Sequence, residues 1–99
     1  MKLQQLRTLV EVSRQNLNLS RAAQTLHISQ PALSKQILQL EDELNVKIFV
    51  RNGKRFVDVT APGREILTIA ERILMEARNL KEVTAEFHNN PQNAAFHVP

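Results

Sequence analysis

The sequence of 99 residues contains no cysteine, tryptophan or tyrosine, and it has only two glycines and four phenylalanines. The lack of cysteine excludes disulfide frameworks, thiolate zinc sites and cysteine nucleophiles. Two glycines are too few for a phosphate-cradling loop of the nucleotide-binding kind. With so few aromatic side chains, a stacking platform for single-stranded nucleic acid is not expected either. We therefore expect no cofactor.

Long apolar runs are also missing. No segment approaches the roughly 18 apolar residues of a membrane span, and polar residues interrupt the N-terminal segment too often for a signal peptide. We therefore expect a cytoplasmic protein that does not contact a membrane. With 42% apolar and 23% charged residues the composition is typical of a soluble folded chain. The length suffices for one domain but not for two full ones.

Positive charge is in slight excess and is unevenly placed. The formal net charge is +3, but residues 1–59 carry nine basic and five acidic residues, whereas residues 60–99 carry four and five. The stretch 47–55 alone holds four basic residues and no acid. A local field of this kind attracts phosphates. On charge alone, a solvated loop with chance clustering explains it about equally well.

Apolar residues at helical spacing predict two helices in the N-terminal part of the chain. Residues 3–15 form an amphipathic pattern. A short second helix is predicted over about 19–27, with Asn18 or Ser20 as its N-cap.

A third helix is predicted to begin after Ser29, which caps it. Pro31 stands in its first turn, where the missing N–H costs nothing. Its buried stripe has spacings of four, three and four and consists of Leu33, Ile37, Leu40 and Leu44. The acidic residues 41–43 near its end oppose the helix dipole, and we interpret them as a charged face.

The Asn-Gly pair at 52–53 lies between β-branched and aromatic runs and predicts a β-hairpin. A two-residue loop at this pair would place Phe49 opposite Phe56 and Arg51 opposite Lys54. Facing aromatic residues stabilise a hairpin, while facing like charges weaken it. Such repulsion at the tip favours an anion there in the working state.

A last helix is predicted over about 61–88, starting after Thr60. Apolar and small residues recur along it at alternating spacings of four and three, which marks a helix–helix seam: Ile66, Ala70, Ile73, Ala77, Leu80, Thr84 and Phe87. The domain of residues 1–59 is too small to cover this seam, so we expect a second identical chain. A helix folded back on its own domain is the alternative. Residues 89–99 have no periodicity and are predicted to be a flexible tail.

The second and third predicted helices together form a helix-turn-helix pattern. Ala22 and Ala23 let the two helices approach closely, and Ile28 buries the turn. The third helix presents its N-terminal end outward, where the positive end of the dipole favours a phosphate. A glutamine there can pair with adenine, while serine and lysine can reach bases or phosphates.

From Ser20 to Ile37 the sequence reads SRAAQTLHISQPALSKQI, and it resembles the N-terminal domain of LysR-type transcriptional regulators. The resemblance includes Phe49-Val-Arg51 and Thr60-Ala-Pro-Gly63 and covers residues 1 to about 86 without a gap. Further segments look closest to the CysB-type branch, which regulates sulfur assimilation and cysteine biosynthesis: 1–7, 16–19, 29–31, 34–36, 40–44 and 53–54. His27 departs from the family pattern, which often has glycine there, and we expect a strained backbone or a different turn at this position.

The resemblance implies a mainly α fold. It consists of a winged helix-turn-helix with three helices and a two-stranded wing over 1–59, followed by a linker helix over 60–88 that pairs with its partner in a homodimer. Full-length members usually form tetramers and carry a C-terminal effector domain. These 99 residues lack that domain, so any small-molecule effector is expected to bind the missing part. The family also implies a cytoplasmic, nucleoid-associated protein.

The resemblance further implies a set of DNA contacts. Four residues match the groove-facing start of the recognition helix: Gln30, Pro31, Ser34 and Lys35. Three match the wing: Arg51, Lys54 and Arg55. Candidate phosphate contacts are Ser20, Arg21 and Ser29. Simpler interpretations remain open, since Gln30 and Ser34 could serve only capping and solvation, and Arg51 could pair with Asp58 or Glu41.

The leading hypothesis is therefore a sequence-specific domain for double-stranded DNA in a bacterial regulator of sulfur or cysteine genes. The alternative is a protein-interaction or dimerisation module that uses the long helix without reading DNA. An enzyme has almost no support, because no nucleophile–base set stands out. His27, His88 and His97 lack the spacing of metal ligands, so no metal site is expected.

Overall fold

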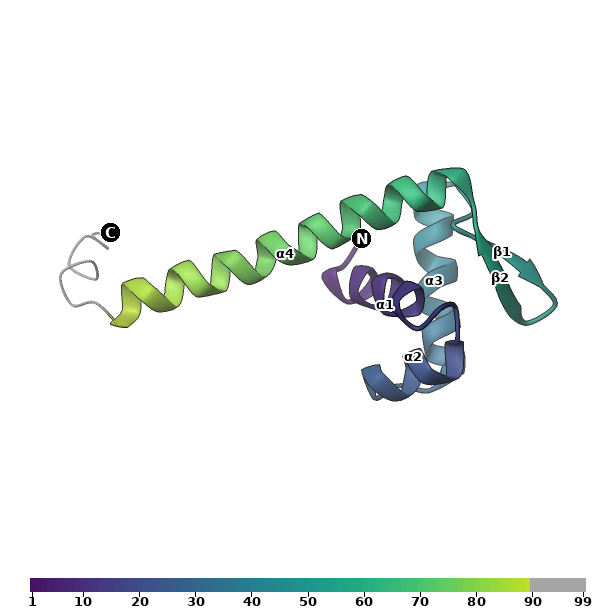
Figure 1. Ribbon diagram of the computed structural model, residues 1–99, viewed down its shortest axis with the longest axis horizontal. Coiled ribbons are helices and arrows are strands. Elements are labelled where there is room, and N and C mark those ends of the chain that lie inside the picture. Colours follow the sequence, from purple (N-terminus) through teal and green to yellow (C-terminus); the bar gives the residue numbers. More distant parts are fainter. Residues whose placement is uncertain (90–99) are drawn as a thin grey trace.

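The computed structural model describes residues 1–89 and is mainly helical (Figure 1). Three helices are followed by an antiparallel hairpin and a long fourth helix. The elements are α1 (Leu3–Arg14), α2 (Leu19–Leu26), α3 (Gln30–Leu44), β1 (Phe49–Asn52), β2 (Arg55–Val59) and α4 (Ala61–Asn89). This element order confirms the predicted fold class, a winged helix-turn-helix followed by a long helix.

The starts of α2 and α3 follow from local capping. The Asn18 side chain accepts a hydrogen bond from the N–H of Arg21 at 3.0 Å, and the Ser29 hydroxyl accepts one from the N–H of Ala32 at 3.2 Å. Each cap satisfies one of the amide groups that the first turn of a helix leaves without a partner. Asn18, and not Ser20, is therefore the N-cap of α2.

Both helices of the helix-turn-helix end at a residue whose backbone is in the left-handed conformation. His27 has φ 57° and ψ 40° after α2, and Asn45 has φ 56° and ψ 41° after α3. After His27, the N–H of Ile28 donates to the carbonyl of Ala23 at 3.1 Å, which closes the helix in a Schellman-type turn. Glycine adopts this conformation without a steric cost. The unusual backbone expected at His27 is thus confirmed.

The apolar stripes of the three helices meet the base of the hairpin and the first turns of α4 in one core. The predicted α3 stripe is confirmed at Leu33, Ile37 and Leu40, which are fully buried, whereas Leu44 is only half-buried. Ile48 and Phe49 join this core from the wing. The core therefore fixes the position of α3 relative to the wing.

The hairpin turns one residue later than predicted. Its two loop residues are Gly53 and Lys54, and Asn52 pairs with Arg55. Gly53 has φ 63°, while Lys54 is not among the described residues with positive φ. A positive φ at the first loop position alone is the pattern of a type II′ turn, which favours glycine there.

The predicted pairs Phe49–Phe56 and Arg51–Lys54 are therefore wrong. Arg51 lies opposite Phe56, and the ladder is irregular between Val50 and Arg51. The two phenylalanine rings nevertheless stack, with centroids 4.7 Å apart and planes 21° from parallel. Since no like charges face each other at the tip, the argument from repulsion to an anion does not hold.

The junction between the hairpin and α4 is tight. The hydroxyl of Thr60 donates to the carbonyl of Lys47 at 2.5 Å and accepts from the N–H of Gly63 at 3.0 Å. A Cβ at Gly63 would lie 2.2 Å from the carbonyl oxygen of Ile48. Glycine is thus what lets α4 begin this close to the residue before β1.

The first half of α4 lies across its own domain, and the second half extends away from the other elements (Figure 1). Ala70 is only 1% exposed within the single chain, because α1 packs against this part of α4. Of the other predicted seam residues, Ile66, Ile73 and Ala77 are half-buried, whereas Leu80 is 68% exposed. The alternative of a helix packed on its own domain therefore applies at Ala70, which a second chain cannot cover, and the dimer expectation stays a prediction for the exposed part of the seam.

Two expectations concern the ends of the chain and the membrane. Asn89, which was assigned to the predicted tail, belongs to α4, and the rest of that tail, residues 90–99, lies outside the described residues. Among residues 1–89, no helix combines the length and the apolar character that crossing a membrane requires.

Candidate nucleic-acid interface

The exposed start of α3 lies beside α2 and the wing. Gln30, Pro31 and Lys35 are exposed, and Ser34 is half-buried. The hydroxyl of Ser20 at the start of α2 donates to the side-chain oxygen of Gln30 at 3.0 Å. The structure therefore brings together predicted contact residues from the two helices of the helix-turn-helix.

Two grooves separate the start of α3 from the wing. The larger, of about 540 Å³, is lined by Gln30, Pro31, Ser34, Arg51, Gly53, Lys54 and Phe56. The second, of about 370 Å³, is lined by residues 16–20 together with Gln30, Lys54, Arg55 and Phe56. Because Gln30 and Lys54 line both, the predicted reading helix and the predicted wing meet at a single continuous surface.

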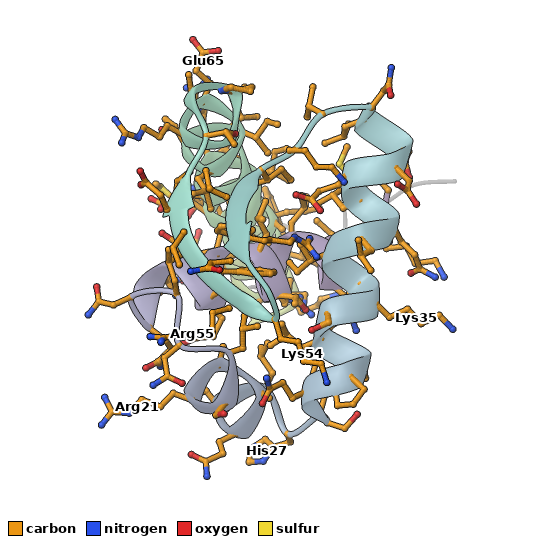
Figure 2. The ribbon with its side chains drawn as sticks, turned by 90° about the vertical axis from the view of Figure 1, so that its right-hand side faces the viewer. Arg21, His27, Lys35, Lys54, Arg55 and Glu65 are labelled. Atoms are coloured by element: carbon orange, nitrogen blue, oxygen red, sulfur yellow. The ribbon has the colours of Figure 1, made fainter. Side chains whose placement is uncertain are left out.

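Four cations lie on the elements that form this surface. Arg21, Lys35, Lys54 and Arg55 extend from α2, α3 and the wing, whereas Glu65 lies at the opposite end of the domain (Figure 2). Lys35 extends from the side of α3 that faces away from the wing (Figure 2). Within residues 1–89, none of these four cations forms an ion pair with an acidic side chain. Their charge is therefore available to a polyanion.

Arg51 differs from the other predicted wing contacts. Its guanidinium lies 2.5 Å from a carboxylate oxygen of Glu41, and the Arg51 side chain is only 27% exposed. The same guanidinium lies over the ring of Phe56, 4.7 Å from the centroid. Of the two acids considered for Arg51, the structure selects Glu41, while Asp58 lies 3.9 Å from Arg64.

Glu41 was named as a possible partner of Arg51, but its burial was not predicted. It was interpreted as part of a charged face, but it is 2% exposed and accepts the N–H groups of Ile48 at 2.8 Å and Phe49 at 3.4 Å. Its position in the sequence could have indicated this burial. Glu41 stands four residues after Ile37 and three before Leu44, so it shares their face of the helix.

A second surface lies between α1 and α4. A groove of about 350 Å³ there is lined by Leu3, Arg7, Val10, Glu11, Arg14, Leu26, Leu74, Ala77, Arg78 and Lys81. Next to it, Leu80 and Val83 expose 68% and 49% of their surface on the projecting half of α4. This apolar and basic surface is separate from the grooves beside α3.

The predicted contact residues offer hydroxyls, an amide and cations. Within residues 1–89, no group of three or more histidines or acids is arranged to hold a metal ion. Side chains of this kind can bind phosphate oxygens and the hydrogen-bonding edges of bases.

Comparison with known proteins gives a family match over residues 3–64, to the model of the bacterial regulatory helix-turn-helix proteins of the lysR family. The chain is 52% identical over 87 residues to the HTH-type transcriptional regulator CysB of Burkholderia cenocepacia. It is 47% identical over 90 residues to the HTH-type transcriptional regulator cbl of Escherichia coli. These matches cover 88% and 91% of this chain, but the chain spans only about 28% of the length of either relative.

A solved structure of the BenM DNA-binding domain in complex with catB site 1 DNA is also similar. The TM-score is 0.83 at 29% sequence identity, and the match covers 90% of this chain and 94% of the other. The similarity therefore includes the helix-turn-helix, the wing and most of the long helix.

Proposed function

Because the chain belongs to the lysR family of bacterial regulatory helix-turn-helix proteins, we propose that it is the part of a transcription regulator that binds double-stranded DNA. The observation that carries this proposal is the continuous surface where the start of α3 meets the wing tip, with cations that no acid among residues 1–89 pairs with. The similarity to a domain whose structure was solved in complex with DNA supports the proposal.

The side chains divide into two roles on this surface. At the start of α3, Gln30, Ser34 and Lys35 read base edges in the major groove, and Pro31 packs against a thymine methyl group. The wing residues Lys54 and Arg55 contact phosphates, and three residues of the helix-turn-helix do the same: Ser20, Arg21 and Ser29. Phosphate contacts fix the register of the protein on the duplex, and base contacts supply the sequence preference.

The first test separates these roles by substitution. A selection from random duplexes provides the preferred site, and fluorescence anisotropy then measures affinity at several salt concentrations. Gln30→Ala is expected to reduce discrimination at one base position by about 1–3 kcal/mol. Lys54→Ala is expected to weaken binding to all sequences about equally and to lower the slope of log affinity against log salt by about 1.

Arg72→Ala serves as the matched control, since Arg72 is an exposed cation on α4 that lines neither groove. Its removal lowers the net charge by the same amount as Lys54→Ala but removes no proposed contact. If Gln30→Ala and Lys54→Ala both bind as the control does, the assignment of the reading surface is wrong.

We propose further that the regulated genes serve sulfur assimilation or cysteine biosynthesis. The similarity to the CysB and cbl regulators supports this step. Immunoprecipitation of the full-length protein on its own chromosome tests it. We expect enrichment upstream of genes for sulfate uptake and reduction, and enrichment confined to unrelated genes would contradict the proposal.

The assembly is proposed as a homodimer that uses the projecting half of α4, with Leu80, Thr84 and Phe87 toward the partner. Its support is the exposed second half of the seam next to the groove between α1 and α4. We propose further that the full-length protein forms a tetramer. A small-molecule effector would bind in the part of the relatives that this chain does not span.

A further inference from the structure

One buried carboxylate ties the base of the wing to α3. One oxygen of Glu41 accepts the N–H groups of Ile48 and Phe49, and the other accepts from the guanidinium of Arg51. Both oxygens are thus engaged by the segment that leads into and forms β1. A buried carboxylate with this set of partners fixes the strand relative to the helix that carries it.

The contacts continue from Arg51 into the second strand. Its guanidinium lies over the ring of Phe56, and that ring stacks on Phe49. Glu41 therefore reaches both strands through Arg51. Such anchoring matters because a hairpin with strands of four and five residues is marginally stable by itself.

The charge of Arg51 is already matched inside the protein. Glu41 lies in direct contact with it, and the side chain is mostly buried. A phosphate contact by Arg51 would compete with this carboxylate. Lys54 and Arg55, which are exposed at the wing tip, have no such competitor among the described residues.

We propose that Glu41 and Arg51 are positioning residues for DNA binding. Together they hold the wing at the angle that brings Lys54 and Arg55 to the duplex, and Arg51 does not itself contact a phosphate. This inference rests on the proposed function, because it assigns the means by which the proposed wing contacts are placed.

The variant Glu41→Gln, which removes the charge of this side chain, gives a test. The two possible roles of Arg51 predict opposite changes in its affinity for duplex DNA. If Arg51 bound a phosphate, Glu41→Gln would release it, remove a negative charge and strengthen binding. A positioning role predicts that the loosened wing weakens duplex binding about tenfold. Asp42→Asn is the matched control, because it makes the same change of charge one residue further along, at an exposed side chain. It is expected to bind as tightly as the wild type or slightly more tightly.

A double-mutant cycle supplies a readout that a merely structural role would not change. Lys54→Ala should cost much less affinity in the Glu41→Gln background than in the wild-type chain, because the displaced wing no longer delivers Lys54. Circular dichroism of each 99-residue variant verifies folding. If Glu41→Gln does not fold, the cycle of Arg51→Gln with Lys54→Ala tests the same positioning role.

The outcomes are distinct. Weaker binding by Glu41→Gln together with a reduced cost of Lys54→Ala supports the inference. Binding by Glu41→Gln that matches or exceeds that of Asp42→Asn overturns it, as do losses for Arg51→Gln and Lys54→Ala that simply multiply. A wild-type chain that binds no duplex would instead contradict the proposed function.

Discussion

Gly63 sets how closely α4 can approach the wing. Its substitution by alanine sets a gain in helix propensity against a steric clash. Helix propensity alone favours alanine by up to about 1 kcal/mol. A Cβ at this position, however, would lie 2.2 Å from the Ile48 carbonyl oxygen and 2.9 Å from the Thr60 hydroxyl. We therefore expect Gly63→Ala to lower the free energy of unfolding by roughly 1–3 kcal/mol. Urea unfolding followed by far-UV circular dichroism measures the change, and a stabilised variant would show that α4 shifts away without cost.

Individual residues also show where the sequence is informative. The unusual backbone at His27 could be predicted, because the position in the turn and the departure from the family's glycine are both visible in the chain. The role of Glu41 could not be predicted with the same ease, since an acid at a helix end is usually solvated. Its burial depends on Ile48 and Phe49, which fold back over the end of α3.

At the scale of elements, helices were more predictable than the hairpin. The N-caps Asn18 and Ser29 and the first-turn Pro31 act locally, so the starts of α2 and α3 follow from a few neighbouring residues. The register of the hairpin depends instead on contacts distant in sequence. Burial of Phe56 and the pairing of Arg51 with Glu41 accompany the observed register, in which Arg51 lies opposite Phe56 and not Lys54.

The long helix shows a different limit. The spacing of its apolar residues predicts a helix–helix seam, but a periodic pattern does not specify the partner. The first half of α4 packs on α1 of the same chain, which buries Ala70 and half-buries Ile73. Only the second half, with Leu80, projects beyond the domain. The same spacing therefore runs from a half that packs on its own domain into a half that is exposed in the single chain.

For the whole molecule, the central question is whether the projecting half of α4 joins two chains. Leu80 is 68% exposed, so Leu80→Lys should leave the folding of a single chain within about 0.5 kcal/mol of the wild type. In a dimer, the same change places a charge in the apolar contact between chains. We expect Leu80→Lys to convert the dimer into a monomer, as measured by analytical ultracentrifugation.

The same variant should separate assembly from DNA reading. When two DNA-binding surfaces are joined, the second half-site is bound at a high effective concentration, so a full site is bound far more tightly than a half-site. Leu80→Lys should therefore lose at least about tenfold in affinity for the full site while retaining wild-type affinity for an isolated half-site. Met75→Lys is the control, because Met75 is 54% exposed but does not belong to the seam. If the two variants behave alike, or if the wild-type chain is monomeric and already binds full and half-sites equally, the projecting half of α4 does not join the reading surfaces.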